Sequence, residues 1–217
     1  MRKWRQCQKQ EENNKGYFPF YRDIRGKKCV IVGGGKVALR KTEKLLSFSP
    51  DITVVAPKIC AELEKLPLAF IRREFRDADL SGAFMAIAAT EDNALNTRIS
   101  KLCRERNIHI NSVDDIENCS FIFPALVHKD DITVGISTGG TSPVFAKFLR
   151  MSIEEQLDDR TIEAARLLKN CRPLVMKKFS TENERRAVME TLLERCLSGG
   201  SLPEEKDIAK FLEETPK

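Results

Sequence analysis

The chain has 217 residues, of which 41% are hydrophobic and 32% are charged. This composition excludes a disordered chain and a membrane bundle, and the length suits one full domain with a smaller appendage. The formal net charge of +5 suits an anionic ligand but is too small to argue for nucleic acid.

The seven cysteines are an odd number and include no C-x-x-C pair. Their spacing fits neither a disulfide framework nor a zinc site, and no His/Cys/Asp cluster has metal-ligand spacing. There is no secretory signal and no apolar stretch long enough to cross a membrane. We therefore expect a cytoplasmic protein with no fixed metal site and no membrane contact.

The first half of the chain alternates short apolar runs with helical spacing. Residues 1–16 are polar and lack periodicity, which predicts a flexible leader. Short β-branched runs at 29–32 and 52–56 indicate buried strands, and 37–48 between them has the spacing of a helix. Within that helix we expect Val37, Leu45 and Leu46 to face inward.

The alternation continues with strands at 69–73, 84–89 and 108–113 and with a helix that begins at Asp92 or Asn93. It predicts an α/β fold, a Rossmann-like doubly wound parallel sheet over residues 17–115.

The pattern then changes. Residues 121–127 and 132–137 read as two strands of an antiparallel hairpin within an extension at 116–150. Residues 151–217 show helical patterns alone and predict a small helical domain. Of the two histidines, we expect His109 to be packed in its strand and His128 to be solvated at the hairpin tip.

A glycine turn follows the first strand and opens the first helix. Residues 33–38 read G-x-G-x-x-A, in which Gly33 makes the tight turn, Gly34 follows it, and Gly35 lets the backbone approach a pyrophosphate. The helix start offers unpaired N–H groups to the phosphates. A tight turn without a ligand is the alternative.

The adenosine end lacks an expected residue. The second strand should end in an acidic side chain for the ribose, but the sequence there is Ala56-Pro57-Lys58. Since Lys58 could accept a 2′-phosphate, the choice between NAD and NADP is not fixed by this rule.

Two further polar segments follow strands. Asp114 and Asp115 come after the 108–113 strand, where Asp114 is a candidate general base, although both carboxylates could simply begin a loop. Residues 137–143 form a second strand–glycine–helix junction, with Ser142 as helix cap, that could hold an anion or could be an ordinary capped helix.

Taken together, the segments VGGGKVALRK, VVAP, IAATEDNALN, NSVDD, SFIFPA and STGGTSP resemble, in order and spacing, the precorrin-2 dehydrogenases of siroheme synthesis. The same module forms the amino-terminal part of siroheme synthase. The resemblance covers about residues 18–157. It implies NAD-dependent oxidation of precorrin-2 to sirohydrochlorin, and some members of the family also insert ferrous iron as a second substrate.

The resemblance also implies roles for individual residues. Asp114 matches the catalytic aspartate. The residues that would hold NAD are Gly33, Gly34, Gly35, Lys36, Val37, Pro57, Lys58, Ala89 and Thr90. The residues assigned to the substrate are Asn111, Thr138, Gly139, Gly140, Thr141 and Ser142. Thr138 stands where relatives often have Ser, which keeps the hydroxyl but puts any role that requires serine in doubt.

The resemblance implies a homodimer, and the large apolar residues of 151–217 exceed the needs of one small lobe, which makes packing on a partner subunit plausible. A lobe folded back on its own sheet is the alternative. Basic side chains of this region could reach substrate carboxylates or could form a solvated face; they are Arg160, Arg166, Lys169, Arg172, Lys177 and Lys178. A non-enzymatic NAD(H)-sensing module is the alternative function. It explains the glycine turn but not the GGTSP segment. A nucleic-acid binder would rest on net charge alone.

Overall fold

The computed structural model describes residues 17–113, 115–198 and 201–215. They divide into two compact units: residues 18–124 form the first, and Tyr17 with the residues from 125 onward forms the second. Each unit has hydrophobic core clusters of its own. No helix in the described ranges is long and apolar enough to span a membrane. The predicted leader at 1–16 lies outside the described residues.

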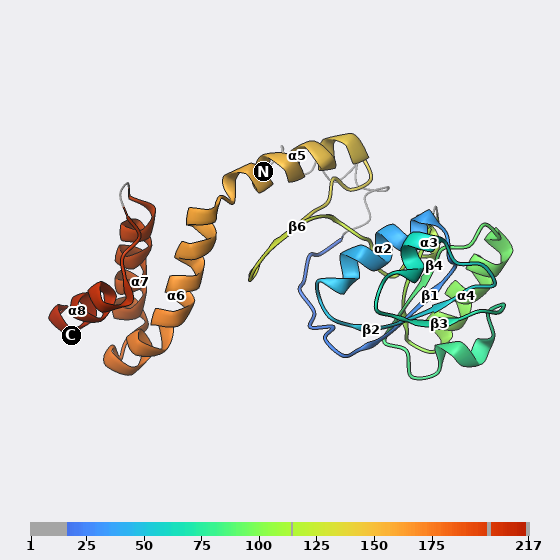
Figure 1. Ribbon diagram of the computed structural model, residues 1–217, viewed down its shortest axis with the longest axis horizontal. Helices are drawn as coiled ribbons and strands as arrows, with labels where there is room; N and C mark the ends of the chain where they lie inside the picture. The colour runs from blue at the N-terminus through green and yellow to red at the C-terminus, as the bar shows by residue number, and fades with distance from the viewer. Residues whose placement is uncertain (1–16, 114, 199–200, 216–217) are drawn as a thin grey trace, which may run out of the picture. The chain divides into compact units, whose positions relative to one another are not determined.

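The first unit is built on five parallel strands in the order β3-β2-β1-β4-β5 (Figure 1). These strands are β1 (Lys28–Val32), β2 (Asp51–Val55), β3 (Ala69–Ile71), β4 (Met85–Ala88) and β5 (His109–Ser112). The three middle strands are covered on both faces, which explains why their sequences are continuous apolar runs. The order and direction of the strands confirm the predicted Rossmann-like sheet.

Helices cover the two faces of this sheet (Figure 1). They are α2 (Lys36–Leu46) and α3 (Ala61–Glu64) on one face, and α4 (Asn93–Glu105) with the short helix η2 (Asp77–Leu80) on the other. β1 and β4 are neighbours, and the helices that follow them lie on opposite faces, which makes the carboxyl ends of these two strands the topological switch point of the sheet. A dinucleotide site belongs at this edge.

The predicted helix starts are confirmed. The Asp92 side chain caps α4 by accepting hydrogen bonds from the backbone of Ala94 and Leu95. On α2, Leu45 is buried as expected, but Val37 and Leu46 are half-buried. The other buried residues of α2 are Ala38 and Thr42, since these positions share the face of Leu45 at helical spacing.

The second unit begins with the hairpin of β6 (Ala125–Lys129) and β7 (Ile132–Ile136). The expected start of the first strand at 121 was wrong, and Pro124, which cannot donate to a strand ladder, precedes its actual start. The first strand extends further toward the turn than predicted, to Lys129, while the second begins at Ile132 as expected. Only Asp130 and Asp131 remain between them, with Asp130 at φ 54°.

Both expectations for the histidines were wrong. His128 lies within β6, half-buried, with Nδ1 2.8 Å from the hydroxyl of Thr133 in the opposite strand. His109 is the exposed first residue of β5, and its ring meets Phe84 edge-on with the centroids 5.0 Å apart.

Helix α5 (Pro143–Gln156) starts at the predicted cap, Ser142, and packs against the hairpin. Val127 is the one buried residue in β6, β7 and α5. Large apolar side chains are exposed along α5, namely Val144, Phe145, Phe148 and Met151. This helix therefore presents an apolar surface that the described residues of its own unit leave uncovered.

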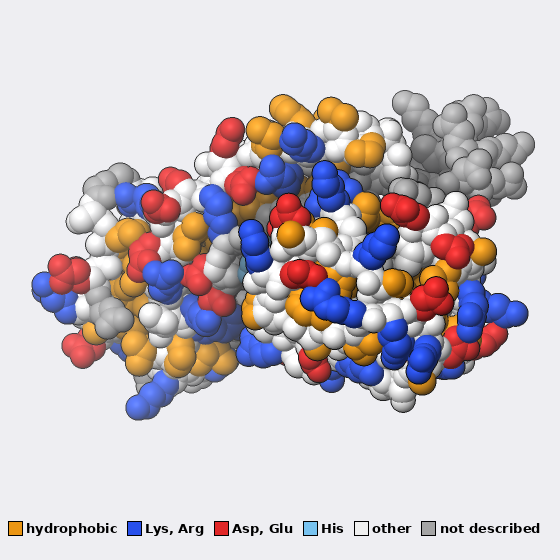
Figure 2. Space-filling model, turned by 45° about the vertical axis from the view of Figure 1, so that its right-hand side comes forward, with side chains coloured by type: hydrophobic (Ala, Val, Ile, Leu, Met, Phe, Trp, Pro, Cys, Tyr) orange, Lys and Arg blue, Asp and Glu red, His pale blue; other side chains and the backbone are white. Residues whose placement is uncertain are grey.

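Three further helices, α6 (Asp159–Lys178), α7 (Glu182–Leu197) and α8 (Glu205–Glu214), share one core. Leu167 and Leu192 are buried in that core, so they do not require a partner chain. In the view of Figure 2, basic and acidic side chains are interspersed over the surface.

Candidate functional site

The glycine turn after β1 is formed as the motif predicts. Gly33 has φ +119°, and a Cβ at this position would lie 2.2 Å from the carbonyl oxygen of Ala89 at the end of β4. A Cβ on Gly34 would lie 2.1 Å from the carbonyl oxygen of Lys58. A side chain at either position would clash with the backbone of a neighbouring segment, so only glycine fits at both positions.

Gly35 differs, because nothing lies within 4 Å of a Cβ built there. It precedes α2, whose start has no side-chain cap among the described residues and no acidic residue in its first turn. The first N–H groups of a helix have no partner within the helix, and they carry its positive dipole end. This open, uncapped start fits a diphosphate group, with exposed Lys36 beside it.

The end of β2 is joined to this turn. The Cys60 N–H donates to the Gly34 carbonyl at 2.8 Å, and the Gly33 N–H donates to Val55 at 3.0 Å. Pro57 and Lys58 between them are exposed next to the turn. The structure thus brings these two predicted residues to the glycine turn.

Thr90, a predicted cofactor residue, is held at the end of β4 by Asn96. The Asn96 Oδ1 accepts from the Thr90 hydroxyl at 2.7 Å and from its N–H at 3.3 Å, and Nδ2 donates to its carbonyl at 3.0 Å. Asn96 is only 3% exposed. The sequence reasoning missed Asn96; a polar residue on the inward face of a predicted amphipathic helix was the available signal.

Asp114 lies outside the described residues, and Cys119 contacts the chain on either side of it. The Cys119 Sγ accepts from the Ser112 N–H at 3.1 Å and lies 3.2 Å from the carbonyl oxygens of Ser112 and Asp115. One thiol therefore ties together both sides of position 114. Asn111, predicted for the substrate, is buried and donates its Nδ2 to Phe121 at 3.1 Å.

Asp115 has a structural task. Its carboxylate caps the short helix η3 (Ile116–Asn118) by accepting from the Asn118 N–H at 3.1 Å. Hydrogen bonds from the Asn118 side chain and backbone lower the pKa of Asp115, outweighing partial burial, with Arg104 contributing charge. The lowered pKa makes Asp115 a weaker base, and its carboxylate is already used as the cap of η3, so it does not suit the role of proton acceptor.

A cavity of about 230 Å³ lies at this edge of the sheet, lined by Asn93, Asn96, Ser112, Val113 and Asp115. Its walls come from the end of β5, the loop after it and the start of α4. It lies beside the Asn96–Thr90 contact and next to position 114 in the chain. Within the described ranges, no group of three potential metal ligands occurs here or elsewhere.

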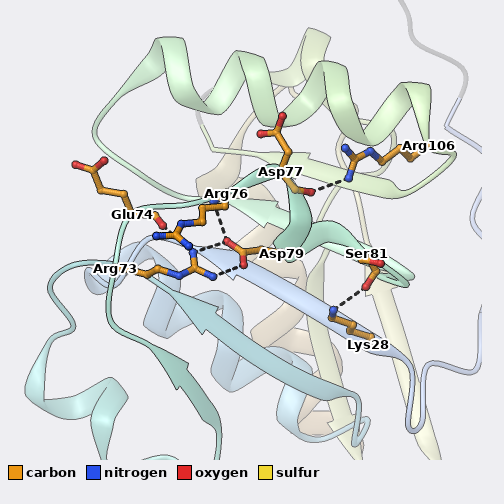
Figure 3. Close-up of polar contacts among 8 residues, drawn as sticks. All are labelled: Lys28, Arg73, Glu74, Arg76, Asp77, Asp79, Ser81 and Arg106. Carbon is orange, nitrogen blue, oxygen red and sulfur yellow. Dashed lines mark hydrogen bonds and ion pairs between the residues drawn. The ribbon is translucent and has the colours of Figure 1, made fainter.

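An ion-pair network holds the segment that follows β3 (Figure 3). Arg73 binds both carboxylate oxygens of Asp79, at 2.9 and 2.6 Å, and the Arg76 N–H donates to the same carboxylate at 2.8 Å. The Arg73 hydrogen bonds are the main reason that the pKa of Asp79 is lowered. Nearby, Lys28 Nζ donates to the Ser81 carbonyl at 2.7 Å.

The GGTSP segment belongs to the second unit and forms a self-contained turn. The Ser142 hydroxyl accepts from the Phe145 N–H at 3.2 Å, and the Thr138 hydroxyl donates to the Ser142 carbonyl at 3.2 Å. Gly139 and Gly140 have φ of 60° and 86°. Substrate binding by residues 138–142 stays a prediction.

Most of the basic side chains considered for the substrate in the last helices have partners within their unit. Arg160 donates to the Cys196 carbonyl at the end of α7, and Lys178 to the carbonyls that end α8. Arg166 and Lys169 pair with Asp130 and Asp131 of the hairpin turn, at 3.0 and 2.6 Å. These cations cap helices and fix the turn.

Comparison with known proteins finds a matching family, curated relatives and a similar solved structure. Residues 20–125 match a family described as putative NAD(P)-binding. Siroheme synthase of Thioalkalivibrio sulfidiphilus is 39% identical over 182 residues, which cover 82% of this chain and 37% of that protein. Siroheme synthase of Vesicomyosocius okutanii is 32% identical over 208 residues, covering 92% and 45%. The chain thus spans less than half of the length of these relatives.

Among solved structures, SirC, precorrin-2 dehydrogenase, has a TM-score of 0.72 at 23% identity, covering 92% of this chain and all of that one. This likeness confirms the fold. The sequence matches show a putative NAD(P)-binding domain at residues 20–125, in a chain that is similar to part of siroheme synthase.

Proposed function

We propose that this chain is an NAD-dependent precorrin-2 dehydrogenase that forms sirohydrochlorin in siroheme biosynthesis. The single observation that carries the proposal is the open, uncapped start of α2 beside Gly35. The names of the relatives, siroheme synthase and precorrin-2 dehydrogenase, supply the substrate class.

The first unit contains the residues that would bind NAD. The N–H groups at the start of α2 and the backbone of Gly35 and Lys36 would hold the diphosphate, with Val37 following in the first turn. Exposed Pro57 and Lys58 would lie toward the adenosine. Ala89 and Thr90 would support the dinucleotide at the end of β4. Bound NAD supplies the hydride acceptor, so the chain has to position the substrate and manage one proton.

Asp114 would accept that proton. Oxidation of precorrin-2 removes two hydrogens: one leaves as hydride, and the other leaves as a proton that needs a base. Of the two adjacent aspartates, Asp115 is committed to capping η3 and its pKa is lowered, which leaves Asp114 for the transfer. The substrate is an acidic tetrapyrrole, and we propose that Asn111 and residues 138–142 contribute to its binding.

The test is an anaerobic assay with precorrin-2 and NAD that follows NADH and tetrapyrrole absorbance together. We expect turnover by the wild-type chain, and a loss of about 10²–10⁴-fold in kcat with unchanged NAD affinity for Asp114→Asn. Glu117→Gln, an exposed carboxylate three residues away, is the matched control and should retain activity. NAD binding without oxidation of precorrin-2 would favour the NAD(H)-sensing alternative.

Three further parts of the proposal need their own tests. Ferrous iron would be a second substrate, inserted into sirohydrochlorin while Asp114 accepts pyrrole protons; adding iron to the same assay tests this step. The extension at 116–150 would form a homodimer, which the exposed apolar side chains of α5 support. A reducing cytoplasm is the proposed location, in keeping with free thiols at all six described cysteines.

A further inference from the structure

The hydroxyl of Ser112, the last residue of β5, is buried without a partner. Ser112 is 3% exposed, and its Oγ has no hydrogen-bond partner among the described residues. Buried hydroxyls are nearly always hydrogen-bonded to protein, water or a ligand. The described residues therefore provide no partner for this hydroxyl.

The Ser112 side chain points to the α4 face of the sheet. Ile110, two residues earlier on the same face, packs with Ile99 and Cys103 of α4. The cavity of about 230 Å³ lies on this side, where Ser112 faces the start of α4 with Asn93 and Asn96. One water needs only about 10–15 Å³, so the space is large enough for an organic ring.

The cavity also lies in line with the diphosphate position. The glycine turn ends β1, Thr90 follows the neighbouring β4, and Ser112 ends the next strand, β5. Asn96 links the last two, because it holds Thr90 and lines the cavity. A dinucleotide extended along the carboxyl ends of the strands would reach from the turn into this space.

We propose that this cavity receives the nicotinamide ring of NAD and that the Ser112 hydroxyl hydrogen-bonds its carboxamide. A carboxamide has an acceptor oxygen and two N–H donors, and a serine hydroxyl can pair with either. Asn93 and Asn96 add amide groups to the same wall. This inference rests on the proposed function, since it assigns one end of the proposed cofactor.

Calorimetry with the full chain measures the affinity for each ligand, and the choice of ligands distinguishes contacts to the nicotinamide end of the cofactor from contacts to the ADP-ribose end. The probes are NAD, ADP-ribose, which lacks nicotinamide, and 3-acetylpyridine adenine dinucleotide, in which a methyl group replaces the carboxamide NH₂. For Ser112→Ala we expect NAD to bind roughly threefold to tenfold more weakly, and ADP-ribose to bind as in wild type. If the hydroxyl accepts from the carboxamide NH₂, the preference of wild type for NAD over the acetylpyridine analogue shrinks in the variant. If it donates to the carboxamide oxygen, which the analogue keeps, both dinucleotides bind the variant more weakly and the preference is unchanged.

Ser100→Ala is the matched control. Ser100 is also buried on α4 with an unpartnered hydroxyl, but it does not line the cavity, so all three affinities should stay unchanged. Thermal unfolding without ligand checks that both variants fold, as expected from removing an unpartnered hydroxyl. Equal NAD affinity in Ser112→Ala and wild type, or an equal loss for NAD and ADP-ribose, would overturn the inference alone. Failure of the wild type to bind either ligand would instead overturn the proposed function.

Discussion

Gly33 and Gly35 stand two residues apart in one turn, yet different physical demands require glycine at each. Gly33 adopts a φ of +119° and packs against the backbone at the end of β4. Gly35 has an ordinary φ of −90° and open space where a side chain would start. The first serves folding, and the second, under the proposed function, leaves room for the ligand.

This difference predicts opposite behaviour for two alanine variants. Gly33→Ala should lower the free energy of unfolding by about 1–3 kcal/mol or more, because the new Cβ meets a carbonyl oxygen in a strained backbone. Gly35→Ala should fold as well as wild type but bind NAD about tenfold or more weakly, because its methyl group enters the diphosphate space. Urea unfolding and calorimetry measure the two quantities. A Gly35→Ala variant that unfolds early and binds normally would contradict this assignment.

Asn96 supports the site through Thr90. Asn96→Ala leaves the Thr90 N–H and carbonyl without their side-chain partner, so we expect a loss of about 1–3 kcal/mol in stability together with weaker NAD binding. Asn96→Asp keeps the acceptor but loses the donor to the Thr90 carbonyl, and should weaken binding as well. Thr97→Ala, at an exposed position on the same helix, is the control. Normal NAD affinity in Asn96→Asp would remove Asn96 from the support of the site.

At the scale of elements, the sequence was most informative where a single local force decides the structure. Continuous β-branched runs predicted the parallel strands, and side-chain caps predicted the starts of α4 and α5. The first hairpin strand was placed too early because the apolar run through Phe121 continues across Pro124. The polar side chain on an inward helix face was a signal for Asn96, but the partners of Asn96 and Cys119 could not be assigned from sequence, since they depend on how separate elements pack together.

The segment between β3 and α4 predicts a pH effect on stability (Figure 3). The Asp79 side chain is 6% exposed and Arg73 is 33% exposed, so their pairing is shielded from solvent. We expect Asp79→Asn to lower the free energy of unfolding by about 1–3 kcal/mol at neutral pH. The lowered pKa of Asp79 means that this contribution is present above the unfolded pKa, about 4, and is lost as pH falls through the folded value.

Urea unfolding of wild type and Asp79→Asn from pH 7 to pH 3 measures this effect. The difference between the two proteins should be largest near neutral pH and should shrink below about pH 4. Glu74→Gln, which alters a neighbouring exposed carboxylate, should show no such change. A constant difference across the range would mean that the ion pair is not its source.

At the scale of the whole molecule, the two units differ in how completely they bury their apolar residues. The sheet of residues 18–124 is covered on both faces, and α6, α7 and α8 share a core. The β6–β7 hairpin and α5 lie between these parts in the sequence, and together they bury one residue, Val127, among those described. A two-stranded hairpin is marginally stable in water, so these elements need further apolar contact.

A second copy of the chain is the partner we expect for this surface. Phe145 and Phe148 stack with centroids 6.2 Å apart and are 51% and 59% exposed. Burying a phenylalanine contributes about 1.5–3 kcal/mol, so replacing both with glutamate should weaken association by about a hundredfold or more. Sedimentation equilibrium should show a wild-type dimer and a monomeric double variant.

NAD affinity should persist in the variant, because the glycine turn belongs to the other unit. Leu174→Glu, at a similarly exposed position on α6, should leave the dimer intact. If the wild type is monomeric, or if Leu174→Glu also dissociates it, then α5 does not form the interface.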